Sequence, residues 1–166
     1  ADQMRIVEAD TFERLELSAR ASVLRLTGVN RALEGLAIDV FNTMREFGDL
    51  AGDPFLEFCE DWMLADEVTH VKMGSDWLRK VTENDPERRK KALEFQGIVD
   101  KLFSYGGTRS DSEESPIGLA RRFRELAGFT DSEVEDIAEV SLAALNERKD
   151  AVARLQAEAA SQFAGR

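Results

Sequence analysis

The sequence predicts an all-α protein. Prolines number only three among 166 residues, and the chain contains long runs rich in Ala, Leu, Glu and Arg. Apolar residues recur along these runs in alternating steps of three and four, the spacing of one helix face. The composition, 43% hydrophobic and 33% charged, is typical of a globular protein, and the length fits one domain with a real core.

The first expected helix begins at a capping signal near the N-terminus. Asp10 to Glu13 reads Asp-Thr-Phe-Glu, which resembles a capping box. The helical pattern then continues to about Phe47, and Thr27-Gly28 predicts a kink or break on the way.

The second expected helix is the central one. Residues 48–53 form a short Gly- and Asp-containing connection, and Asp53-Pro54 supplies an N-cap followed by proline at the first helical position. The helix should extend to about Thr82. Because the connection is short, we expect the two helices to lie antiparallel and adjacent.

The remaining capping and stop signals divide the rest of the chain into three helices and a loop. They predict a helix from 84–86 to 105, an exposed loop over 108–115, a short helix from 115 to 127, and a final helix from 130 towards 163. We therefore expect a helical core over residues 1–107, on which the loop and C-terminal helices of residues 108–166 pack.

Charge and cysteine content restrict the possible partners and location. A net charge of -11 argues against nucleic acid or an anionic membrane as the main partner. No stretch approaches the ~18 uninterrupted apolar residues of a membrane span. The single Cys59 excludes an intrachain disulfide and predicts a small core residue in a protein of the reducing cytoplasm.

Two polar residues of the central helix occupy an otherwise apolar stripe. Glu67 and His70 lie one turn apart, within a series that the spacing predicts to face other helices: Met63, Glu67, His70, Gly74, Trp77 and Val81. Burying a carboxylate and an imidazole without partners costs several kcal/mol. A metal ion is a partner that suits Glu-x-x-His, so we expect one here.

Glu34 is a third candidate ligand, because apolar residues flank it on the preceding helix. It stands about 13 residues before the connection, and Glu67 stands about 13 residues after it. At ~1.5 Å of rise per residue, both side chains should lie ~20 Å from the connection and so level with each other. Asp66 and Asp39 are expected to be surface acids, or acids that orient the free ring nitrogen of His70.

Several large side chains near these residues are expected to belong to the core. They are Phe41, Met44, Trp62 and Trp77.

The donor set indicates half of a two-metal site. Helical bundles that bind two metal ions use four Glu and two His, whereas this chain offers Glu34, Glu67 and its only histidine, His70. Carboxylates and imidazole suit iron, with manganese or zinc as other choices. A two-fold homodimer could double the set, an N-terminal half or a second chain could complete it, or the site could be degenerate.

Two segments resemble an uncharacterised bacterial ferritin-like family, a distant relative of the di-iron tRNA hydroxylase and of rubrerythrin-like proteins. The segments are Arg31–Val40 and Ala65–Trp77, which carries Asp-Glu-x-x-His-Val-x-x-Gly-x-x-Trp, and the likeness is strongest over residues 20–82. The resemblance implies a ferritin-like four-helix bundle with a two-metal carboxylate centre. It carries ligand roles to Glu34, Glu67 and His70 alone.

The relatives place a first Glu and another Glu-x-x-His in an upstream helix pair that has no counterpart in this sequence. Glu8, Glu13 and Glu16 have no His three residues later. This difference favours a bundle completed by a second copy, by a second chain or by a longer form of this one. The expected function is a di-iron oxidase or oxygenase. The alternatives are an iron-binding or storage protein and a metal-free helical interaction module.

Overall fold

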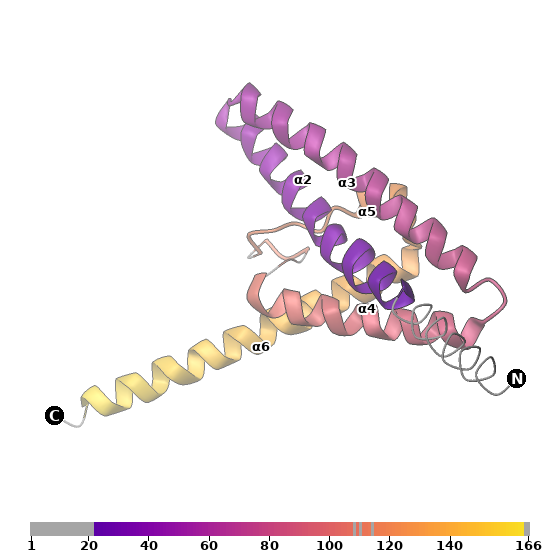
Figure 1. Cartoon of the computed structure of the whole chain (residues 1–166). Coiled ribbons are helices and arrows are strands. Elements are labelled where there is room, and N and C mark those ends of the chain that lie inside the picture. Colours follow the sequence, from indigo (N-terminus) through magenta and orange to yellow (C-terminus); the bar gives the residue numbers. More distant parts are fainter. Residues whose placement is uncertain (1–21, 108, 110, 114, 165–166) are drawn as a thin grey trace, which may run out of the picture.

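The computed structural model describes residues 22–107, 109, 111–113 and 115–164, and this part of the chain is helical without strands (Figure 1). The all-α prediction is therefore confirmed. The capping signal at Asp10 lies outside the described residues. The elements are η1 (Leu26–Leu33), α2 (Glu34–Ala51), α3 (Pro54–Val81), α4 (Pro86–Gly107), α5 (Arg121–Leu126) and α6 (Asp131–Ala164).

The segment η1 is a π-helix, wider than an α-helix, and it continues directly into α2. It begins at the place where Thr27-Gly28 predicts a kink. Thr27 is buried, and its hydroxyl donates to the Val23 carbonyl oxygen at 3.0 Å. This irregular turn sets the direction in which α2 starts.

Helices α2 and α3 form the predicted antiparallel pair (Figure 1). Gly52 ends α2 in the left-handed conformation, with φ of 66°. The Asp53 side chain then accepts hydrogen bonds from the backbone N–H groups of Phe55 and Leu56, at 3.1 and 3.0 Å. A side chain at Gly48 would come within 2.8 Å of the Glu57 backbone nitrogen, so the two helices approach closely beside the turn.

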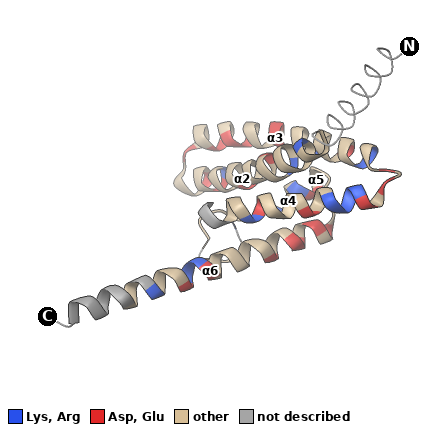
Figure 2. Ribbon diagram, turned by 60° about the horizontal axis from the view of Figure 1, so that its bottom comes forward, with Lys and Arg blue, Asp and Glu red and all other residues tan. Residues whose placement is uncertain are grey.

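Figure 2 shows the α2–α3 pair on one side of the molecule and α4 with α6 on the other. The caps of these last helices follow the sequence signals. The Asp85 carboxylate accepts from the Arg88 backbone N–H at 2.9 Å, one residue before α4 begins. Before α6, the Glu133 side chain accepts from the Thr130 backbone N–H at 2.8 Å, and the Thr130 hydroxyl accepts from the Glu133 N–H at 3.3 Å.

The prediction of a helix over residues 115–127 is wrong in its first half, since α5 begins only at Arg121. Side chains of α2 hold the preceding backbone outside a helix. The Thr43 hydroxyl accepts from the Gly118 N–H at 3.1 Å, and the Asp39 carboxylate accepts from the Ala120 N–H at 3.0 Å. These bonds from a distant helix outweigh the local signal of Ser115-Pro116.

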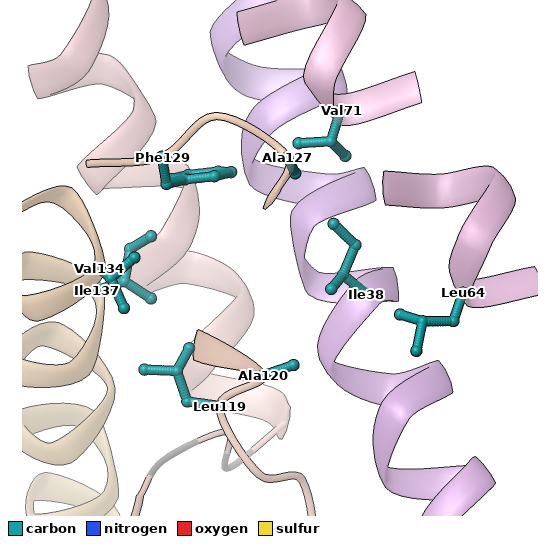
Figure 3. Packing of buried hydrophobic residues seen from close by; sticks show 9 residues of the cluster. All are labelled: Ile38, Leu64, Val71, Leu119, Ala120, Ala127, Phe129, Val134 and Ile137. Atoms are coloured by element: carbon teal, nitrogen blue, oxygen red, sulfur yellow. The ribbon is translucent and has the colours of Figure 1, made fainter. Parts of the chain in front are cut away.

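The core lies between the α2–α3 pair and α6, and the segment around α5 fills its middle (Figure 3). Ile38 of α2 and Val71 of α3 are fully buried, and Phe129 is 4% exposed. The cluster joins residues that lie far apart in the sequence: Ile38, Leu64, Val71, Leu119, Ala120, Ala127, Phe129, Val134 and Ile137.

Three of the side chains that we expected in the core are exposed instead. Trp62 is 68% exposed, Trp77 is 50% exposed and Met44 is 37% exposed. Phe41 is half-buried and packs against the core cluster, and Cys59 is also half-buried. The physical reason is that no described element covers the side of the α2–α3 pair that is turned away from α5 and α6. Separately, none of the described helices has the length and apolar character needed to cross a bilayer.

Candidate metal centre

Glu67 and His70 meet on the surface of α3, one helical turn apart. The distance from His70 Nδ1 to Glu67 Oε2 is 3.6 Å, which is longer than a hydrogen bond. Glu67 Oε2 is a buried atom with no hydrogen-bond partner. A carboxylate oxygen in this state is costly unless a cation or a proton satisfies it.

Glu34 is brought towards these two residues by the junction between η1 and α2. It is the first residue of α2, and its Oε2 accepts a hydrogen bond from Asn30 Nδ2 at 2.9 Å. Asn30 lies against α3, where a side chain at Gly74 would come within 2.7 Å of the Asn30 Cβ. The π-helical turn thus fixes a carboxylate next to α3, and such turns are frequent at functional sites.

The three residues influence one another electrostatically. Partial burial raises the pKa of Glu67 above its ordinary value, the negative charge of Glu34 raises it further, and His70 opposes the rise. The ionised form of Glu67 is therefore disfavoured both by burial and by the negative charge of Glu34.

The three candidate residues are too exposed to form a closed site. The Glu67 side chain is 22% exposed and Glu34 is partly buried, whereas the His70 side chain is 49% exposed. The prediction that this stripe of α3 faces other helices is wrong for the described part of the chain. Met63 and Val81 in the same stripe are also exposed, and only Gly74 is buried. The helix η1 packs on this stripe only at Gly74, against Asn30, and no described helix covers the exposed members of the stripe.

Asp66 and Asp39, the two acids expected near His70, lie in different environments. Asp66 is exposed, and its Oδ1 lies 3.7 Å from His70 Nε2, so each ring nitrogen of His70 approaches one carboxylate. Asp39 is neither a surface acid nor a partner of His70, because its side chain is fully buried. It binds Arg124 instead, with Oδ2 2.7 Å from Nη2.

Asp39 belongs to a buried network of charges that sequence reasoning missed. Arg109 lies 3.5 Å from Asp39 and 2.7 Å from Asp100, and both of these ion pairs are buried. Arg31 binds Glu133 at 3.0 Å and donates to Gln96 at 2.8 Å. The partners come from η1, α2, α4, α5, α6 and the segment before α5, so the network ties these elements together.

The positive and negative charges of this network are equal in number. The network contains Arg31, Arg109 and Arg124 and the acids Asp39, Asp100 and Glu133. Burial disfavours the charged form of Arg124, but the Asp39 carboxylate more than offsets this, so the pKa of Arg124 lies above its ordinary value. Since every acid in the network is paired with an arginine, these acids are structural. In the sequence, the one sign that these acids are buried is the position of Asp39 next to Ile38, which belongs to the core.

In the described chain, no group of three or more His, Cys, Asp or Glu side chains is arranged to hold a metal ion. Glu34, Glu67 and His70 are therefore not arranged as a ligand set in the described structure. The observation that remains in favour of a metal is Glu67 Oε2, a buried atom that has no hydrogen-bond donor.

Comparisons of this chain with protein-family models, with curated proteins and with solved structures find no match. The resemblance to ferritin-like proteins therefore stays a prediction from the sequence motifs.

Proposed function

We propose that this chain is a ferritin-like metal-binding protein that contributes half of a two-metal carboxylate and histidine site. Glu34, Glu67 and His70 are the ligands, iron is the metal with manganese as the alternative, and the activity is that of an oxidase or oxygenase. The proposal combines the residue types, their motif spacing and their proximity on the α2–α3 pair.

One observation carries the proposal. Glu67 Oε2 is buried without a hydrogen-bond donor, His70 Nδ1 lies 3.6 Å away, and the charge of Glu34 raises the pKa of Glu67. A divalent cation would satisfy the unpartnered oxygen and remove the repulsion between the acids. A purely structural pair of acids would instead be expected to have an arginine beside it, as Asp39 has.

Each residue has a distinct part in this site. Glu67 and Glu34 supply anionic oxygen ligands from two different helices, and His70 supplies a neutral nitrogen. Asp66, near the second ring nitrogen of His70, orients the ring and makes it a better ligand. When bound, a pair of iron ions supplies redox chemistry with dioxygen that these side chains cannot perform.

Metal analysis of the full chain tests the proposal. The untagged protein is loaded anaerobically with Fe(II), or with Mn(II), dialysed, and analysed for bound metal and protein. We expect retained transition metal that is lost in His70→Ala and Glu67→Gln and kept in Glu139→Gln, a substitution of an exposed acid on α6. Equal metal content in all four proteins would place the ion elsewhere and contradict the proposal.

A second candidate function is a metal-free helical interaction module. It is favoured by the exposed aromatic side chains of the α2–α3 pair, above all Trp62 and Trp77. No retained metal under any loading condition would support this candidate and exclude the first one. Iron that accumulates well beyond two ions per site after aerobic loading would instead indicate storage.

A further inference from the structure

The first half of α3, close to the α2–α3 turn, carries a row of exposed aromatic side chains. Phe55, Phe58 and Trp62 follow one another in steps of three and four, so they lie on one face of the helix. They are 75%, 69% and 68% exposed. Leu64, which lies ~200° around the helix from Trp62, is buried in the core (Figure 3). The row therefore points away from the core.

This aromatic row is large for the surface of a single chain. A Phe or Trp side chain offers about 150–250 Å² for burial, so the three together present on the order of 400 Å². That area is comparable to the largest apolar patch of an ordinary monomer, and such patches are often interaction sites. The turn end of the α2–α3 pair also extends beyond the other described helices, which leaves the row accessible (Figure 1).

The chain around the aromatic row is acidic. From residue 46 to residue 71, the sequence contains eight acids and no lysine or arginine. Asp61 lies one turn from Phe58, and Asp66 lies one turn from Trp62, so both acids flank the row. Their side chains are 68% and 58% exposed. The eight acids are Glu46, Asp49, Asp53, Glu57, Glu60, Asp61, Asp66 and Glu67.

Neighbouring cationic groups offset the two flanking acids weakly. Arg45 Nε lies 4.0 Å from Asp61 Oδ1, and His70 Nε2 lies 3.7 Å from Asp66 Oδ1, and both distances are longer than a hydrogen bond. Exposed pairs of this kind contribute little. An acid that is covered by a neutral apolar surface loses water without gaining a counter-charge. A partner that covers the row must therefore bring positive charge of its own.

We propose that this acidic ridge, defined by Phe55, Phe58, Asp61, Trp62 and Asp66, binds a basic amphipathic helix of a partner protein. Side chains at helical spacing form a ridge that packs into the groove of another helix. The apolar anchors of the partner recur at the same spacing, and its lysines or arginines face the two acids. The same negative charge repels nucleic acid and anionic membranes.

Fluorescence anisotropy of a labelled model peptide, measured with the full chain in chelator, tests this inference independently of the proposed metal site. The probe is a helical peptide of leucine and lysine whose leucines follow helix spacing. We expect binding that weakens as the salt concentration rises. Trp62→Ala should weaken binding about tenfold or more, because a few aromatic anchors dominate such interfaces. Combining Asp61→Asn with Asp66→Asn should weaken binding and reduce its dependence on salt.

The matched controls are Leu102→Ala on α4 and Glu139→Gln on α6, because both side chains are exposed on other helices. Both variants should bind the peptide as the unsubstituted chain does. Circular dichroism verifies that every variant is folded.

Three outcomes would overturn the inference. Equal affinities of Trp62→Ala and Leu102→Ala would show that the peptide binds an acidic chain without using the ridge. Equally tight binding of a peptide with glutamate in place of lysine would show that the partner need not be basic. Sedimentation velocity without peptide covers the third outcome, since a dimer that Trp62→Ala dissociates would assign the ridge to a second copy of this chain.

Discussion

At the scale of single residues, the Asp39 side chain connects α2 to α5 and to the segment before it. Its carboxylate binds the buried Arg124 and Arg109 and also accepts from the Ala120 N–H. Removing one charge from a buried pair leaves the other uncompensated, at a cost of ~3–5 kcal/mol. We expect Asp39→Asn to lower the free energy of unfolding by about this amount in urea denaturation.

Asp76 provides the control for Asp39. It also pairs with a basic residue, Arg79 at 2.6 Å, but both side chains are exposed. Exposed pairs contribute only ~0–1 kcal/mol, so Asp76→Asn should change little. An equal effect of the two substitutions would show that burial of the network is not what stabilises the fold.

Glu67 should make the metal-free protein less stable as pH rises. Its folded-state pKa lies above the ordinary value of 4.5 because of burial and Glu34. Between 4.5 and the raised folded value, the unfolded chain releases the proton more readily, so unfolding is favoured as pH increases. Below 4.5 both states are protonated and the effect disappears.

Replacing Glu67 by glutamine removes this ionisation. In chelator, Glu67→Gln should be more stable than the original protein at pH 7, and the difference should shrink towards pH 4. Thermal unfolding at several pH values measures this, with Glu139→Gln as the exposed control. A constant difference across the pH range would contradict the environment described for Glu67.

Residue-scale prediction succeeded where the signal was local and failed where it depended on distant partners. The caps at Asp53, Asp85 and Thr130 are formed by neighbours in the sequence, so their patterns sufficed. The role of Asp39 depends on Arg124, 85 positions later. A helical pattern cannot reveal such a partner.

At the scale of elements, Gly52 controls the α2–α3 turn. Its φ of 66° is a left-handed conformation that costs a residue with a Cβ ~1–2 kcal/mol. We expect Gly52→Ala to destabilise the protein by about 1 kcal/mol in urea denaturation, even though no atom lies within 4 Å of the added methyl group.

Gly97 is the matched comparison. It also has no atom within 4 Å of an added Cβ, but it lies inside α4. Alanine favours a helix interior over glycine by ~0.8–1.0 kcal/mol, so Gly97→Ala should stabilise the protein. The same sign of effect at both positions would contradict the left-handed turn.

Most elements were predictable because helix periodicity and capping are local, and α3 matches its expected limits within a residue. The length of α5 was overestimated because the side chains of Thr43 and Asp39 hold the backbone before α5 outside a helix. The stripe with Trp77 and His70 was expected to face other helices, but both side chains are exposed. Periodicity reveals that a face exists but does not reveal what covers it.

On the scale of the whole molecule, we propose that the α2–α3 pair is half of a bundle. One side of the pair packs on α5 and α6 around the core, and no described element covers the other side, which carries the exposed His70 and Trp77. The proposed two-metal site needs a second helix pair to supply its remaining ligands. The function we propose depends on that completion.

Native mass spectrometry of the full chain loaded with Mn(II) tests this most directly, because one spectrum reports both subunit number and bound metal. The account predicts bound metal in the unsubstituted protein and none after His70→Ala. A metal-free monomer from the unsubstituted protein, under the same loading, would contradict it.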